Sequence, residues 1–182
     1  MNNSFTLVLR YIKSDLYRYR GNTKFFSFIK EYIRNPAFRF QIKIRLCNGG
    51  GGVRLYGIIL YVLFPNRNLK IPWRTEIGFG LYIGHNGPLI INPSAKIGNN
   101  CNLSQFTTIG SNKGQAATIG DNVYIGPNVC IVEDVQIGNN VTVGAGSVVT
   151  KDIPDNATAV GNYAKVINFD NPARFIGNRW KV

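Results

Sequence analysis

The sequence predicts a mainly β protein, with a parallel β-helix over residues 70–168, a small helical region over 1–69 before it and a tail over 169–182 after it. Three observations support this division. Aliphatic residues recur every six positions in the second region, apolar and basic residues interleave in the first, and most of the net charge belongs to the first.

Residues 71–150 follow a six-residue pattern of aliphatic positions, many of them followed by glycine. The positions are Ile71, Ile77, Ile83 and Leu89, then, after a slip of two, Ile91, Ile97, Leu103 and Ile109, and, after a longer break, Ile119, Ile125, Ile131, Ile137, Val143 and Val149. A period of six indicates a parallel β-helix, in which each hexapeptide is a short strand plus a bend. Each aliphatic residue points into a narrow prism, and the glycine or asparagine beside it accepts the tight bend. We therefore expect about four to five stacked coils.

Two interruptions of the repeat are candidate functional loops, because loops on a rigid scaffold often carry function. The first is "NGPLIIN" (86–92), directly after His85, the single histidine of the chain. The second is "GSNKGQAAT" (110–118), which adds four residues between Ile109 and Ile119 and must project from the prism.

The helical region contains "KFFSFIKEYIRNPAFRFQIKIRL" (24–46), whose apolar and basic residues have helix-like spacing interrupted at Pro36. The most apolar window, residues 55–64, is half of the roughly 20 residues that a membrane-spanning helix needs. We expect two or three short helices that can pack on the end of the solenoid. The tail has no pattern that assigns it a structure.

The net charge of +12 is unevenly distributed, with +11 in residues 1–70 and +1 in residues 71–182. This asymmetry favours an anionic partner for the basic part: a membrane surface, nucleic acid, or an acidic or phosphorylated substrate. A solvated basic face without a partner is the alternative. Nucleic acid fits poorly, because no recognised binding motif accompanies the charge.

The cysteine and histidine content speaks against a metal site. Three cysteines without a C-x-x-C pair indicate neither a disulfide framework nor a zinc site, and one histidine per chain excludes a three-histidine zinc centre. The amino-terminal sequence lacks a signal-peptide layout. We expect no metal and a cytoplasmic location, at the inner face of the membrane if the basic region docks there.

The repeat, together with "VTVGAGSVVTKDIPDNATAVGNYAKVI" (141–167), resembles the hexapeptide-repeat acyltransferases, which are left-handed β-helices that use acetyl-CoA. The resemblance covers residues 70–167. Within the family, "IGH" followed by "IIN…AKIG" is similar to the serine acetyltransferase branch, and more so to its relatives that acetylate sugars in capsule and exopolysaccharide synthesis.

The resemblance implies a role for particular residues. It makes His85 the catalytic histidine, and it places the acetyl-CoA contacts at Gly110, Ser111, Gly126, Pro127, Gly144, Ala145, Gly146, Lys151 and Lys165. Candidates for contact with the acceptor are Lys70, Trp73, Arg74, Glu76 and Asn86. The resemblance also implies a homotrimer, with CoA bound between neighbouring chains.

The departures from the serine acetyltransferase pattern concern the acceptor. Lys70 and Gly84 stand where that branch has aspartates, and Ala116 lies near the position of its second histidine. Tyr163 replaces the usual proline of the closing Gly-Asn-Pro-Ala pattern. Because the serine-recognition residues are missing, a serine acceptor is disfavoured.

The expected reaction is the transfer of acetyl from acetyl-CoA to a sugar hydroxyl of a surface-polysaccharide precursor. A histidine with an ordinary pKa near 6.5 is largely neutral at cytoplasmic pH and can take the hydroxyl proton. Its other ring nitrogen needs a carboxylate, with Glu76 as one candidate, or a backbone carbonyl. The alternatives are a serine O-acetyltransferase and, in a different class, a non-catalytic β-helix that serves as an assembly module.

Overall fold

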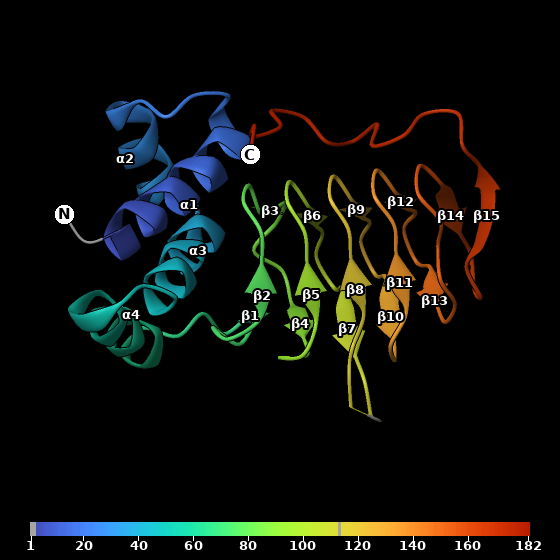
Figure 1. Ribbon diagram of the computed structural model, residues 1–182, viewed down its shortest axis with the longest axis horizontal. Helices are drawn as coiled ribbons and strands as arrows, with labels where there is room; N and C mark the ends of the chain where they lie inside the picture. Colours follow the sequence, from blue (N-terminus) through green and yellow to red (C-terminus); the bar gives the residue numbers. More distant parts are fainter. Residues whose placement is uncertain (1–2, 113) are drawn as a thin grey trace.

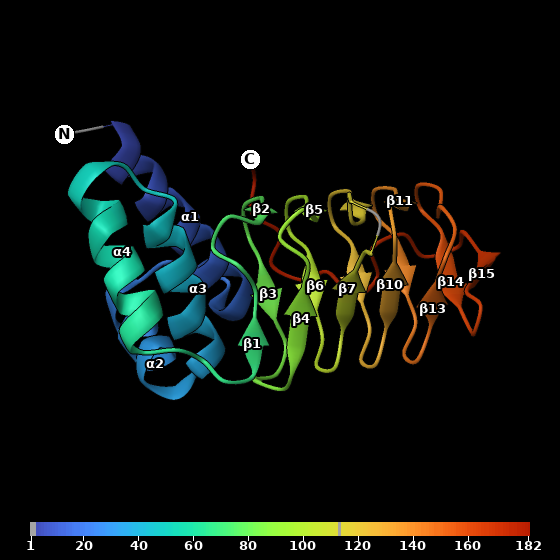
Figure 2. The ribbon, with the colours of Figure 1, turned by 90° about the horizontal axis from the view of Figure 1, so that it is seen from below.

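A computed structural model describes residues 3–112 and 114–182 of the chain. It has two parts, a group of helices and a three-sided β-helix that extends away from them (Figures 1 and 2). The helices are α1 (Asn3–Arg20), α2 (Phe25–Arg34), α3 (Pro36–Cys47) and α4 (Gly51–Leu63). The expected two or three helices were too few, because Asn35 and Pro36 divide one apolar segment into α2 and α3, and α1 forms a separate long helix.

The strands form three flat parallel sheets, one on each face of the prism, apart from one antiparallel strand at the end. Face 1 contains β1 (Leu69–Lys70), β4 (Leu89–Ile91), β7 (Thr108–Gly110), β10 (Cys130–Val132) and β13 (Val148–Val149). Face 2 contains β2 (Glu76–Ile77), β5 (Lys96–Ile97), β8 (Thr118–Ile119) and β11 (Gln136–Ile137). Face 3 contains β3 (Tyr82–Ile83), β6 (Asn102–Leu103), β9 (Tyr124–Ile125), β12 (Thr142–Val143), β14 (Thr158–Val160) and the antiparallel β15 (Lys165–Asn168).

The six-residue pattern predicted the interior of this prism correctly. Of the fourteen aliphatic positions, all but Ile77 are buried, and Ile77 is half-buried beside the helices. Register pairs such as Ile83 with Leu103, and Ile97 with Ile119, stack the inward residues of successive coils. The prediction of a parallel β-helix is confirmed.

Asparagine and glycine both accept left-handed backbone at the bends, as expected, with Gly80 and Gly146 at φ of 68° and 69°, and glycine has a second role. Asn100, Asn122, Asn140 and Asn156 have φ between 55° and 64° at the corner between faces 2 and 3. This left-handed region is one that asparagine tolerates better than most residues. By contrast, a Cβ on Gly98 would lie 2.5 Å from the Gly120 carbonyl oxygen of the next coil. Glycine is required there by the close approach of the backbone.

Polar side chains of α1 and α3 hydrogen-bond the open edge of the first coil, which has no preceding coil to pair with. Asp15 Oδ1 accepts from the Leu81 N–H at 2.9 Å, and Gln41 Nε2 donates to the Leu81 carbonyl at 2.7 Å. Arg45 donates to the carbonyls of Ile77 and Gly78, at 2.8 and 2.7 Å. Because exposed edges of sheets attract other strands, this capping also protects the end of the solenoid.

The tail, residues 169–182, runs back along the outside of the solenoid from β15 to the helices (Figure 1). Its residues Ala173 and Ile176 are buried, and its Phe175 packs against Tyr124 of β9. The Trp180 N–H donates to Asn100 Oδ1 at 2.8 Å. The tail therefore ties the last coil to the second coil and, through Arg18, to α1.

In the ranges 3–112 and 114–182, none of the helices combines the length and the apolar character that crossing a bilayer requires.

Candidate active site

His85 lies in the bend that joins β3 on face 3 to β4 on face 1, and its side chain is exposed. The corner of the prism at which faces 3 and 1 meet, formed by residues 84–88, 104–107, 126–129 and 144–147, is called the His85 corner below. Among the residues that the structure describes, no side chain or carbonyl hydrogen-bonds the imidazole. Both ring nitrogens are therefore available to a ligand or a neighbouring chain.

The bend at His85 is longer than those stacked on it, as the slip in the repeat predicted. The inward residues are eight apart in this bend, from Ile83 to Ile91, and six apart in the next coil, from Leu103 to Ile109. Two asparagines of the α4–β1 connection hold the longer bend in place. Asn66 Nδ2 donates to Asn86 Oδ1 at 2.8 Å, and Asn68 Nδ2 donates to the Asn86 carbonyl at 2.7 Å.

Gly84, next to the histidine, has room for a side chain. The nearest atom to a Cβ built there is Tyr82 Cε1, at 3.6 Å. Packing therefore does not require glycine at the position where serine acetyltransferases have an aspartate. Ala116, near the position of their second histidine, is fully buried.

Five of the proposed acetyl-CoA residues share the His85 corner, in coils further along the solenoid. They are Gly126, Pro127, Gly144, Ala145 and Gly146. Backbone hydrogen bonds stack these bends, since the Asn128 N–H donates to the Gln105 carbonyl at 3.1 Å and the Gly146 N–H to the Pro127 carbonyl at 2.8 Å. These small residues form a strip two and three coils beyond His85, and the coil between them and His85 carries Gln105 and the exposed Phe106 at this corner.

The other proposed acetyl-CoA residues lie elsewhere on the chain. Gly110 and Ser111 are at the opposite edge of face 1, where Ser111 Oγ donates to Glu133 Oε2 at 2.8 Å. Lys151 follows β13 at the same edge, whereas Lys165 begins β15 and pairs with Val160, in the coil after Gly144. Lys113 of the insertion between β7 and β8 lies outside the described residues.

Only some of the residues predicted to contact the acceptor lie near His85. Asn86 is its chain neighbour, and the exposed Lys70 lies on face 1, paired with Ile90. Trp73 and Arg74 stack on each other at the corner between faces 1 and 2, with the guanidinium carbon 4.9 Å from the ring centre. Glu76 lies on face 2, which is opposite the His85 corner. Glu76 therefore does not orient the imidazole of its own chain.

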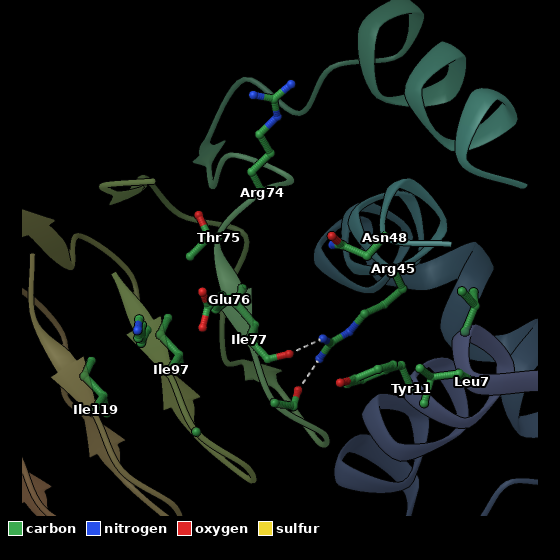
Figure 3. Close-up of a pocket in the computed structure, with 14 residues that line it drawn as sticks. Leu7, Tyr11, Arg45, Asn48, Arg74, Thr75, Glu76, Ile77, Ile97 and Ile119 are labelled. Carbon is green, nitrogen blue, oxygen red and sulfur yellow. Dashed lines mark hydrogen bonds between the residues drawn. The ribbon is translucent and has the colours of Figure 1, made fainter. Parts of the chain in front are cut away.

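A large cavity also lies away from His85. It has a volume of about 530 Å³ and lies between α1, α3 and face 2 (Figure 3). Its floor is Ile77, Ile97 and Ile119, and Arg45 crosses it to reach backbone carbonyls. Its lining includes Arg74 and Glu76, two of the residues predicted to contact the acceptor. Apart from the Glu76 carboxylate, no side chain of the described lining residues is suited to take the proton of a hydroxyl group at neutral pH.

A smaller, strongly basic pocket lies next to the His85 bend, and of its lining residues only Asn86 was predicted from the sequence. It has a volume of about 420 Å³ and is lined by Arg39 and Lys43 of α3 and by Asn66, Arg67, Asn68 and Asn86. The concentration of charge in residues 1–70 was a signal of such a site. Only the folded chain brings these particular residues together, because α3 and the α4–β1 connection are far apart in the sequence.

The described residues contain no group of three or more His, Cys, Asp or Glu side chains placed to hold a metal ion. Cys47 and Cys101 are fully buried, and burial raises the pKa of their thiols to about 11 and about 12.

Comparison with known proteins relates this arrangement to one family. The model of the bacterial transferase hexapeptide family (six repeats) matches residues 116–151. Mitochondrial serine acetyltransferase 3 of Arabidopsis thaliana is 43% identical over 103 residues, which cover 54% of this chain and 26% of that protein. The putative colanic acid biosynthesis acetyltransferase WcaB of Escherichia coli (strain K12) is 40% identical over 116 residues, which cover 62% of this chain and 69% of WcaB.

A solved structure, the soybean serine acetyltransferase apoenzyme, superposes with a TM-score of 0.74 at 27% identity, over 91% of this chain and 72% of that one. The chain thus spans about a quarter of the Arabidopsis relative and most of WcaB and of the soybean structure. The six-residue repeat, the left-handed β-helix that it builds and the match to WcaB lead to one conclusion: the chain belongs to the bacterial hexapeptide-repeat transferase family.

Proposed function

We propose that this chain is an O-acetyltransferase that moves an acetyl group from acetyl-CoA to a sugar hydroxyl, with His85 as the general base. The observation that carries the proposal is the position of His85. The histidine is exposed on the corner of the prism that also carries the strip of small residues, two and three coils further along. A surface histidine without a role would not require the longer, asparagine-braced bend that holds it.

In the proposed reaction, neutral His85 takes the proton of the acceptor hydroxyl as the oxygen attacks the thioester carbonyl. The resulting tetrahedral oxyanion accepts hydrogen bonds from backbone N–H groups of the bends. The intermediate then collapses, the carbon–sulfur bond breaks, and the imidazolium returns its proton to the CoA thiolate. The products are an acetyl ester and free CoA, and general-base help of this kind contributes roughly 10²–10⁴ in rate.

We place acetyl-CoA along the strip of small residues on the His85 corner. Gly126, Gly144 and Ala145 add little side-chain bulk, which suits the narrow pantetheine arm. Lys165, exposed at the far end of the strip, would meet the CoA phosphates. Lys151, exposed at the opposite edge of face 1, would do so from a neighbouring chain.

A homotrimer would complete this site. Gly110 and Ser111 lie at the edge of face 1 opposite His85, so they can approach an imidazole only in a neighbouring chain. Packing three prisms side by side brings such opposite edges together, and the CoA groove then lies between chains. Closed cyclic symmetry of this kind is common among soluble oligomers.

A sugar is the acceptor that we favour. WcaB, which this chain matches over 69% of its length, is described as acting in the biosynthesis of colanic acid. In addition, Lys70, Gly84 and Ala116 supply neither the carboxylates nor the second imidazole of the serine acetyltransferase pattern. Gly84 has space for a side chain, so the missing carboxylate is not imposed by the fold.

Serine is the second candidate, because serine acetyltransferases are found both among the sequence relatives and among the similar structures. An assay of CoA release separates the two. Purified protein is given acetyl-CoA with serine, neutral oligosaccharides, or sugars linked to phosphate. Turnover with a sugar and none with serine supports our proposal. Turnover with serine alone would replace it by the second candidate.

We further propose that the protein works in the cytoplasm, at the inner surface of the membrane. The helical end exposes large apolar side chains, among them Phe25 and Phe26 of α2 and Leu55 and Leu63 of α4. Basic residues interleave with those of α2. Apolar side chains beside lysine and arginine suit the surface of an anionic bilayer.

Flotation with lipid vesicles tests this location. The variant Phe25→Ser/Phe26→Ser should lose binding to vesicles with anionic lipid, and the control Phe169→Ser, at an exposed aromatic of the tail, should keep it. Wild-type protein that stays unbound at every lipid composition would contradict the proposed location at the membrane. This result would not bear on the proposed acetyl transfer.

A further inference from the structure

The pocket beside the His85 bend is a concentration of positive charge. Arg39 and Lys43 of α3 line the pocket together with Arg67 of the connection that leads from α4 to β1. No aspartate or glutamate lines the pocket. The ion pairs of the described residues are those of Arg20 with Glu31 and of Arg45 with Asp15, so none of the three cations has an acidic partner.

Neutral carbonyl groups position two of the cations without cancelling their charge. Arg39 donates from one terminal nitrogen to the carbonyls of Tyr32 and Ile33, at 2.7 and 2.8 Å, and Lys43 donates to the carbonyl of Phe64. Partial burial, and then repulsion from Arg39, lower the pKa of Lys43. Like charges held together in this way are stabilised when an anion occupies the space between them.

The pocket borders the bend that carries the proposed base. Asn86 lines the pocket, its side chain is held by Asn66, and His85 is the residue before it. A molecule that placed an anionic group among the cations would therefore have a neighbouring part at the His85 bend. The pocket lies on the helical side of His85, whereas the strip of small residues leads away from the helices.

We propose that this pocket binds a phosphate or diphosphate group on the acceptor, so that the acceptor is a phosphate-linked sugar whose hydroxyl is presented to His85. This inference rests on the proposed function and narrows its substrate class. A diphosphate offers several oxygens and more than one negative charge, which matches two guanidinium groups and an ammonium. The same chemistry occurs in a soluble nucleotide sugar and in a sugar on a lipid diphosphate.

Inorganic diphosphate is the simplest probe, and calorimetric titration of the full chain measures its binding. The principal variant is Arg67→Glu, because Arg67 is exposed and makes no hydrogen bond to another described residue, so its replacement should not disturb folding. We expect binding to weaken about tenfold or more, the size of a lost charge-assisted hydrogen bond. Arg39→Ala/Lys43→Ala should have a larger effect.

The matched control is Lys24→Ala/Lys30→Ala, which removes two exposed cations of the helical region that do not line the pocket. The control should bind diphosphate within about twofold of the wild type, since distant surface charges are largely screened. Equal binding by wild type and Arg67→Glu, or equal loss in the control, would overturn the proposal.

Kinetics then distinguish this site from a CoA site. Diphosphate should compete with the phosphate-linked acceptor, and Arg67→Glu should raise KM for that acceptor while KM for acetyl-CoA is unchanged. Nucleotide sugars in solution and lipid-diphosphate sugars in vesicles are tested in parallel to identify the source of the phosphate. Competition with acetyl-CoA instead would overturn the proposal.

The outcomes also separate this inference from the proposed function. If diphosphate binds to wild type but not to Arg67→Glu, and no acceptor of any class is acetylated, the pocket stands and the proposed function fails. If neutral sugars are acetylated with equal kcat/KM by wild type and Arg67→Glu, the proposed function stands and the pocket inference fails.

Discussion

Arg45 is the residue on which the joint between the helices and the solenoid depends. Its guanidinium makes two hydrogen bonds to the Asp15 carboxylate, at 2.9 and 3.0 Å, and two to backbone carbonyls of the first coil. Both side chains are almost completely buried. Since α3 carries Arg45 together with Arg39 and Lys43, this joint also sets the position of the basic pocket relative to His85.

Replacing Arg45 by alanine should therefore destabilise the protein strongly. The change leaves the Asp15 carboxylate buried without its partner, a situation that costs about 3–5 kcal/mol. Urea denaturation measures the free energy of unfolding. The control Arg67→Ala removes an exposed guanidinium that makes no hydrogen bond to another described residue, and it should change the free energy of unfolding by no more than about 0.5 kcal/mol. Equal effects of the two substitutions would show that Arg45 is not the joint.

At the scale of elements, the two ends of the solenoid are held by different devices. Side chains of α1 and α3 satisfy the open edge of the first coil, whereas β15 adds an antiparallel strand to β14 in the last. The tail connects these ends, and Arg18 of α1 meets it. Its Nε donates to the Gly177 carbonyl at 3.0 Å, while its terminal nitrogens reach the Gly80 carbonyl and Asn102 Oδ1.

Removing residues 172–182 should consequently lower the free energy of unfolding of the whole protein. Burial of Ile176 alone contributes about 1.5–3 kcal/mol, and the truncation also removes the hydrogen bonds to Arg18 and Asn100. We expect the free energy of unfolding to fall by about 2 kcal/mol or more. Deletion of only the exposed Lys181 and Val182 is the control and should have no measurable effect. A truncated chain as stable as the wild type would mean that the tail does not tie the coils together.

At the scale of the whole molecule, the solenoid was predictable from the sequence because each of its turns is specified by a short local pattern of residues. Each hexapeptide contains its own inward-facing aliphatic residue, so successive strands can be recognised one by one along the sequence. The two-residue slip in this spacing after Leu89 predicted the longer bend at His85. The tail was not predictable, because its place depends on contacts such as Phe175 with Tyr124 that join distant segments.

The residues of the candidate site were likewise only partly predictable from the sequence. His85 and the small residues at 126–127 and 144–146 were predicted from the resemblance to the hexapeptide-repeat acyltransferases, and in the structure they share one corner of the prism. Glu76 was a poor candidate partner for His85, because residues close in sequence can lie on opposite sides of a three-sided prism. The pocket of Arg39, Lys43 and Arg67 required the packing of α3 on the first coil, which no local pattern encodes.

The proposed homotrimer gives the whole-molecule prediction. Light scattering during size-exclusion chromatography should report about three times the chain mass of 20.2 kDa. Gly110 and Ser111 lie across face 1 from His85, so an active monomer could not use them at that histidine. A protein that is fully active and monomeric at assay concentration would contradict the assembly and the roles given to these two residues.

The central claim is that His85 acts as the general base, and the turnover of acetyl-CoA by His85→Ala tests it most directly. His85 is exposed and unbonded within the described chain, so the variant should fold and bind acetyl-CoA as the wild type does. Its kcat with the working acceptor should fall by about 10²–10⁴. The control Gln136→Ala, at an exposed position of face 2, should retain wild-type kcat. A folded His85→Ala protein that turns over acetyl-CoA as fast as the wild type would contradict the account.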